Sequence, residues 1–113
     1  MIIMIKAVFY RLKNGDIKGF DINGHAGAAK KGEFDMICAA VSAVCYTALG
    51  GLDELCRINT YRESDGNIAM ELPEDTEPKV WADAQTILKT MAIGLMQIEN
   101  QYRRHIKVVF EEV

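Results

Sequence analysis

The chain has 113 residues, of which 50% are hydrophobic and 26% are charged, and its formal net charge is −3. This length and hydrophobic content predict one packed globular domain over residues 1–113, rather than a disordered chain. The mild negative charge, without a basic cluster, disfavours direct nucleic-acid binding.

The three cysteines show no CxxC pair or other zinc-type spacing. The sequence therefore predicts neither a disulfide framework nor a metal site, no cofactor is expected, and a reducing cytoplasm fits best. The N-terminal segment carries Lys6 and Arg11 but no basic leader and no small-residue cleavage site, so we expect a strand rather than a signal peptide. No later segment approaches the length of a membrane span, and no membrane association is predicted.

The N-terminal part of the chain predicts a hairpin. Residues 2–12 are rich in Ile, Val and aromatic side chains, and residues 17–23 form a second run of the same kind. The Asn14-Gly15 pair between them is the strongest short-range signal for a hairpin turn. This hairpin brings Gly24 and His25 to the end of a strand.

The segment that follows, residues 27–32, has no bulky apolar side chain to anchor it. We therefore expect it to be mobile without a substrate, and we assign Gly27, Lys30, Lys31 and Gly32 to a substrate loop. A solvated surface loop and a functional lid are both open interpretations of this segment.

Residues 35–49 predict a largely buried helix that ends at Gly50-Gly51. Asp35 is a good N-cap residue, which places Cys38 at the third helical position. There the unpaired N–H groups and the helix dipole favour a thiolate, and the N–H of Cys38 itself is a candidate donor to an oxyanion. A cysteine in an Ala/Val-rich helix is also commonly a small core residue, and both interpretations stay open.

Three further residues, in this helix or after it, have predicted roles. Cys45 and Cys56 are predicted to fill the core. Ser42 lies one turn after Cys38 on the same face, and its hydroxyl either bonds back to the Cys38 carbonyl or supports the site from beneath.

The rest of the chain predicts a second hairpin at residues 58–63 and 67–72, a second helix at residues 78–102 and a last strand at residues 106–110. The acidic connector at residues 71–78 is either a solvated loop or an attractor of basic substrates. The order of elements predicts an α+β fold, with a mixed or antiparallel sheet built from two hairpins and the C-terminal strand, and with the two helices packed on it.

One set of residues resembles a family signature: Gly24-His25-Ala26, Gly32, Asp35, Ile37-Cys38-Ala39 and Ser42. Together they are similar to the motif of the ribosomal-processing cysteine protease family, Prp, which the chain length and the order of segments also fit. The resemblance implies a catalytic dyad in which Cys38 is the nucleophile and His25 the base. It also gives Asp35, Ser42 and Gly24 supporting positions, and Asp35 can act there as a helix cap, as an orienter of His25, or as both.

The same resemblance implies a reaction and partners. The family removes a short N-terminal extension from the bacterial large-subunit ribosomal protein L-twenty-seven, so that extension is the expected peptide substrate, and a homodimer is the expected assembly. Two other interpretations stay open: a non-catalytic ribosome-assembly or peptide-binding module, and a redox or metal sensor built on Cys38 and His25.

Overall fold

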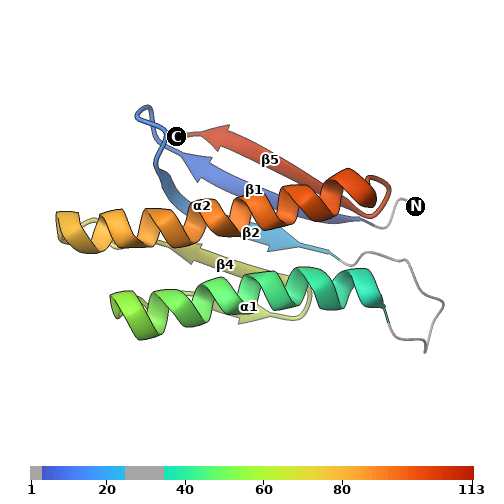
Figure 1. The fold of residues 1–113 in the computed structure, drawn as a ribbon, viewed down its shortest axis with the longest axis horizontal. Helices are drawn as coiled ribbons and strands as arrows, with labels where there is room; N and C mark the ends of the chain where they lie inside the picture. Colours follow the sequence, from blue (N-terminus) through green and yellow to red (C-terminus); the bar gives the residue numbers. More distant parts are fainter. Residues whose placement is uncertain (1–3, 25–34) are drawn as a thin grey trace.

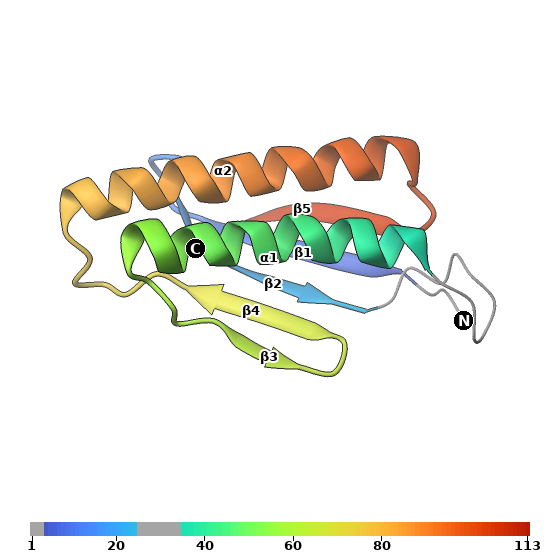
Figure 2. The same ribbon diagram turned by 60° about the horizontal axis from the view of Figure 1, so that its bottom comes forward.

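A five-stranded sheet with both helices on one of its faces makes up the described part of the chain (Figures 1 and 2). The computed structural model describes residues 4–24 and 35–113. Within these residues the elements are β1 (Ile5–Arg11), β2 (Ile17–Asn23), α1 (Met36–Cys56), β3 (Arg62–Ser64), β4 (Asn67–Glu71), α2 (Pro78–Gln101) and β5 (Ile106–Glu112).

The sheet is mixed, in the order β3-β4-β2-β1-β5. β1 and β2 form the predicted antiparallel hairpin, and β3 and β4 form the second one. β4 pairs antiparallel with β2, while β5 returns parallel to β1, with Ile106 opposite Ile5. The predicted α+β class, with two hairpins and a C-terminal strand, is therefore confirmed, and the sheet is the mixed one of the two alternatives.

Alternation along the strands explains why the helices cover only one face. In β1 the side chains of Ile5, Ala7 and Phe9 are at most 3% exposed, while the residues between them lie toward solvent. On α2 the residues Ala84 and Leu88 are fully buried at four-residue spacing, as expected for the apolar face of a helix packed on a sheet. The core thus lies between one face of the sheet and one side of each helix.

The prediction that α1 ends at Gly50-Gly51 is wrong, because the helix continues to Cys56. Its apolar pattern continues past the glycines with Leu52, which is fully buried. Gly51 faces Ile87 of α2, and a Cβ there would make an ordinary van der Waals contact with that side chain at 3.6 Å, so this glycine lies inside the helix where it packs on α2. The helix ends instead at Arg57, which adopts the left-handed conformation with φ of 60°.

The length of α1 also corrects the prediction that no later segment approaches the length of a membrane span. Within the described residues, α1 alone is long and apolar enough to cross a membrane by length and composition. A core helix of a globular protein passes the same test, and one side of α1 carries the buried residues Val41, Cys45, Leu49 and Leu52.

The second hairpin is shorter than predicted on its first strand. The prediction placed a strand at residues 58–63, whereas β3 covers only Arg62–Ser64. Ile58 is buried, and its N–H donates to the Leu52 carbonyl, so its apolar side chain belongs to the end of α1 rather than to the sheet. Two other bounds differ slightly: β5 extends two residues beyond the predicted 110, and Tyr102 is an exposed C-cap after α2.

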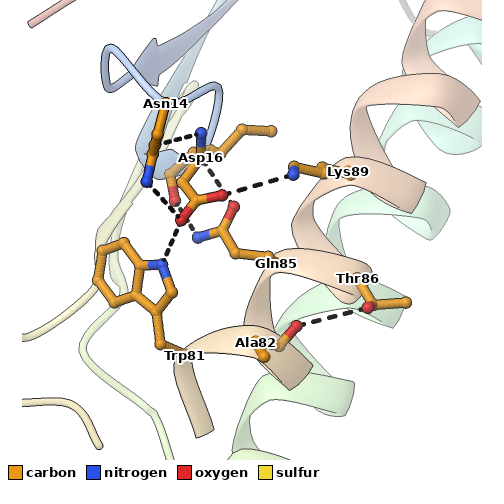
Figure 3. A network of polar contacts seen from close by, with 8 residues as sticks. Asn14, Asp16, Trp81, Ala82, Gln85, Thr86 and Lys89 are labelled. Atoms are coloured by element: carbon orange, nitrogen blue, oxygen red, sulfur yellow. Dashed lines mark hydrogen bonds and ion pairs between the residues drawn. The ribbon is translucent and has the colours of Figure 1, made fainter. Parts of the chain in front are cut away.

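A polar network fastens the β1–β2 turn to α2 (Figure 3). The buried side chain of Gln85 accepts a hydrogen bond from the Ile17 N–H and donates one to the Ile17 carbonyl, both at 2.7 Å. Beside it, Asp16 accepts from the Trp81 indole N–H at 2.8 Å and pairs with Lys89 at 3.5 Å. Gln85 thus satisfies both backbone groups of the buried residue Ile17.

This arrangement predicts that Gln85→Leu lowers the free energy of unfolding by about 2–4 kcal/mol, because two buried backbone groups lose their partners. Lys89→Gln is the matched control in the same network, and should cost less than about 1 kcal/mol because its ion pair is partly exposed. Urea denaturation measures both values. Equal losses in the two variants would contradict the role given to Gln85.

Candidate active site

The start of α1 has the predicted capped geometry. Asp35 is extended, and its Oδ1 accepts hydrogen bonds from the backbone N–H groups of Ile37 and Cys38, both at 3.0 Å. The helix begins at Met36, so Cys38 is its third residue, as predicted. The Asp35 cap is therefore confirmed, and Cys38 lies in the first turn, where the helix dipole favours negative charge.

The cap changes the expected role of one backbone group. The N–H of Cys38 was a candidate donor to an oxyanion, but it already donates to the Asp35 carboxylate. A reaction intermediate could use this N–H only if the cap opened or shared it. While Asp35 accepts this hydrogen bond, the structure does not support the Cys38 N–H as a donor to the oxyanion.

A cavity with a volume of about 500 Å³ lies beside Cys38, between α1 and the β3–β4 hairpin. Its apolar lining comes from both helix and sheet: Ile5, Ile22, Val41, Cys45 and Ile68. Its polar lining comes from Gly24, Ser42, Tyr46 and residues 63–67. In both ribbon views the turn of this hairpin lies on the same side as the start of α1 (Figures 1 and 2). The shape and chemistry suit an extended peptide with an apolar side chain in the floor.

Gly24 joins the hairpin to this cavity. Its φ is +101°, in the left-handed region, and a Cβ at this position would collide with the carbonyl oxygen of Met4. Its N–H donates to the Gly66 carbonyl at 2.9 Å, which ties the end of β2 to the tip of the second hairpin. Only glycine combines this positive φ with the absence of a Cβ that would collide with Met4. Gly24 also lines the same cavity as Cys38.

The position of Ser42 agrees with a supporting role in the site, which is one of its two interpretations. Its side chain lines the cavity one turn after Cys38. No hydrogen bond from its hydroxyl to the Cys38 carbonyl exists within the described residues, although Thr47 makes such a bond to the Ala43 carbonyl at 2.6 Å. The back-bonding interpretation is thus not supported, and a supporting role in the site stays a prediction.

Five predicted site residues lie outside the described residues: His25, Gly27, Lys30, Lys31 and Gly32. The pairing of His25 with Cys38, and the mobility and closure predicted for the loop at 27–32, therefore stay predictions.

The other two cysteines are core residues, as predicted. Cys45 is fully buried, and burial raises the pKa of its thiol to about 12. Cys56 is 7% exposed, and its pKa is raised by burial and, to a lesser extent, by the charge of Asp83. All three cysteines are thiols rather than disulfides. Within residues 4–24 and 35–113, no three His, Cys, Asp or Glu side chains gather in a way that could hold a metal ion.

The sequence reasoning missed two further residues that line the same cavity as Cys38. Tyr46 and Glu63 line it, and the Tyr46 hydroxyl donates to Glu63 Oε2 at 2.6 Å. Tyr46 follows Cys38 and Ser42 at four-residue spacing, and that spacing alone could have placed it on the same helix face. Glu63 carries no comparable local signal, because only tertiary folding brings β3 to α1.

Asp35→Asn separates the two roles left open for Asp35. Asparagine can accept the same two backbone hydrogen bonds, so a pure cap predicts a melting temperature and a turnover within about twofold of the wild type. We expect this result, since a carboxylate beside Cys38 disfavours a thiolate. A drop in turnover of about tenfold or more with an unchanged melting temperature would instead show that the negative charge orients the catalytic base. Thermal melts and a cleavage assay on the same preparation give both readings.

Comparison with known proteins supports the same chemistry. A family model described as cysteine protease Prp matches residues 4–107. The ribosomal processing cysteine protease Prp of Bacillus subtilis (strain 168) is 32% identical over 111 residues, which cover 93% of this chain and 96% of that protein.

Solved structures agree on the fold. The essential ribosomal processing protease Prp from S. aureus, in complex with a covalently linked product peptide, matches with a TM-score of 0.78 at 25% identity, over 96% of this chain and 100% of that one. A second S. aureus Prp structure, in complex with a substrate peptide, matches with a TM-score of 0.74 at 24% identity, over the same shares of the two chains. A protein from Streptococcus mutans matches with a TM-score of 0.77 at 24% identity, over 97% of this chain and 96% of that one.

Proposed function

This chain belongs to the cysteine protease Prp family, and on that premise we propose that it removes the N-terminal extension of the bacterial ribosomal protein L-twenty-seven. The observation that carries the proposal is Cys38, which lies in the first turn of α1 on the wall of a cavity that can take a peptide. Two relatives support it, since the B. subtilis protein is a ribosomal processing protease and the S. aureus protease holds a covalently linked product peptide.

The proposed chemistry uses Cys38 as the nucleophile and His25 as the base. The Cys38 sulfur, ionised by proton transfer to His25, attacks the scissile carbonyl carbon and forms a tetrahedral intermediate. The intermediate collapses to a thioester as the peptide C–N bond breaks, and the imidazolium gives its proton to the leaving amine. Water then attacks the thioester with His25 as the base, which releases the carboxylate product and restores the thiol.

The supporting residues have narrower roles in this proposal. Asp35 holds the first turn of α1 in place, Gly24 brings the end of β2 to the cavity, and Ser42 lines the wall beside the nucleophile. The segment with Gly27, Lys30, Lys31 and Gly32 forms the substrate loop. The apolar floor of the cavity accepts a hydrophobic or aromatic side chain of the extension.

The direct test is incubation of the protein with full-length L-twenty-seven, followed by measurement of product masses. We expect one cut, which separates the extension from an otherwise intact ribosomal protein. Binding of the extended protein without any change in mass would favour the alternative, a non-catalytic ribosome-assembly or peptide-binding module.

A homodimer in the cytoplasm is the second part of the proposal. The odd number of cysteines, without paired spacing, supports a reducing location. A surface groove between α1 and α2 supports the dimer, because its lining is small or apolar: Ala43, Val44, Thr47, Ala48, Gly51, Thr86, Ile87, Thr90, Met91 and Gly94. A second copy of the same face would remove this groove from water.

Light scattering tests the dimer directly. The wild type should show twice the 12.6 kDa mass of one chain. Thr90→Lys places a charge in the groove and should give a monomer, because a charge buried in an apolar contact lacks a partner. Glu74→Lys, in the exposed connector before α2, is the control and should stay dimeric. A dimeric Thr90→Lys protein would exclude this face as the interface.

A further inference from the structure

The cavity beside Cys38 extends along α1 as a groove. Cys38, Ser42 and Tyr46 are spaced four residues apart on the helix and all line it. Eight residues separate Cys38 from Tyr46, which corresponds to about 12 Å along the helix at 1.5 Å per residue. An extended peptide covers that distance in about three or four residues, at roughly 3.3 Å each. A group beside Tyr46 is therefore placed to contact a substrate residue well away from the scissile bond.

The group beside Tyr46 is the carboxylate of Glu63. The Tyr46 hydroxyl donates to its Oε2 at 2.6 Å, which joins α1 to the edge strand β3 across the groove. This bond is also the main cause of the raised pKa of Tyr46. The other oxygen, Oε1, accepts no hydrogen bond within residues 4–24 and 35–113. Glu63 thus presents a held carboxylate with one oxygen available to a ligand.

The charge of the groove has one sign. Among the described residues that line it, the charged ones are Glu63 and Asp65, and both are acidic. Neither takes part in an ion pair within the described chain. The nearest cation in sequence, Arg62, lines a different cavity together with Tyr10 and Lys18 of the first hairpin. No described basic side chain therefore neutralises these carboxylates inside the groove.

We propose that Glu63, held by Tyr46, determines specificity by selecting a Lys or Arg side chain about three or four residues from the scissile bond of the peptide substrate. The inference rests on the proposed protease function. An ammonium or guanidinium at that position donates to the free Oε1, and Asp65 adds to the attraction. Because Tyr46 already fixes the carboxylate, the contact costs less side-chain ordering than a free glutamate would require.

The test uses peptides that cover the ribosomal protein extension and its cleavage site, with Lys, Gln or Glu placed at one position at a time. Competing peptides are cut in one mixture, and their relative kcat/KM values are read by mass spectrometry. We expect the Lys peptide to be preferred over the Gln peptide by about three- to fivefold at one position, the size expected of one exposed ion pair. The preference should fall as ionic strength rises to about 1 M. A preference that is flat along the peptide overturns the proposal.

Enzyme variants assign the preference to residues. Glu63→Gln should remove the Lys preference, Glu63→Lys should reverse it toward the Glu peptide, and Tyr46→Phe should weaken it by about twofold because the carboxylate is no longer held. Glu54→Gln removes an exposed acidic residue of α1 outside the groove and should leave the preference unchanged. A Lys preference that survives in Glu63→Gln contradicts the assignment.

A binding measurement separates this inference from the proposed function. The same labelled peptides are titrated with the Cys38→Ala protein, and fluorescence anisotropy gives their dissociation constants. Tighter binding of the Lys peptide, lost in Cys38→Ala/Glu63→Gln, supports the role of Glu63 even if no peptide is cut, in which case only the protease proposal fails. Equal binding of Lys and Gln peptides at every position rejects the role of Glu63, whether or not cleavage occurs.

Discussion

Cys38→Ala is expected to reduce cleavage of the extended ribosomal protein at least about a thousandfold, because it removes the only atom in this proposal that attacks the scissile carbonyl. The fold should persist. The cap at the start of α1 uses the backbone N–H of residue 38, which alanine retains. Product mass and a thermal melt on the same preparation give both results.

The other two cysteines are the matched controls for this variant. Cys45→Ala and Cys56→Ala delete buried sulfur atoms from the core, so each should lower the free energy of unfolding by about 1 kcal/mol. Cys56→Ala should keep turnover close to that of the wild type, whereas Cys45 also lines the cavity, so Cys45→Ala is the control for stability alone. If Cys38→Ala cleaved at the wild-type rate, Cys38 would not be the nucleophile.

Selective alkylation is the second large effect, and it needs no substrate. We expect iodoacetamide to label Cys38 at least about a hundredfold faster than Cys45 or Cys56 at pH about 6.5, because a thiolate in the first turn of a helix and beside an imidazolium is favoured. Burial raises the pKa of Cys45 to about 12. Its thiolate fraction at pH about 7 is therefore only about one part in 10⁵, and it grows tenfold per pH unit until the pKa is reached.

A pH series followed by peptide mass mapping makes the test specific. Labelling of Cys38 should level off above mildly acidic pH, while labelling of Cys45 should keep rising. His25→Ala should shrink the advantage of Cys38, since it removes the positive partner but leaves the helix terminus. Equal labelling of the three cysteines at pH about 6.5 would show that the free protein holds no thiolate at Cys38. The non-catalytic peptide-binding interpretation would then gain weight.

Local features of the sequence determined much of this protein. The Asn14-Gly15 pair, followed by Asp16, predicts the first hairpin because its turn needs a residue that tolerates positive φ, and Gly15 supplies it with φ of +90°. Asp35 predicts the start of α1 because a short carboxylate can accept the N–H groups of the first turn, and the structure shows two such bonds. These signals act within about four residues, so the sequence displays them directly.

Packing between distant segments decided the end of α1. By local rules Gly50-Gly51 should terminate a helix, yet α1 continues to Cys56. Burial of Leu52 after the glycines, and the contact of Gly51 with Ile87 of α2, favour a continuous helix. A glycine pair weakens a helix by about 1 kcal/mol per residue, which burial of one or two large side chains offsets.

The groove likewise exists only in the folded chain. Cys38 and Tyr46 share a helix face that the sequence implies, but Glu63 reaches them because β3 pairs with β4, and β4 pairs with β2. The contact of Gln85 with Ile17 joins residues 68 positions apart in the same way. Hydrogen bonds and charges act over a few ångströms in space, whatever the separation in sequence. The sequence therefore determined which residues could react, and the tertiary structure decided which side chains line the groove beside them.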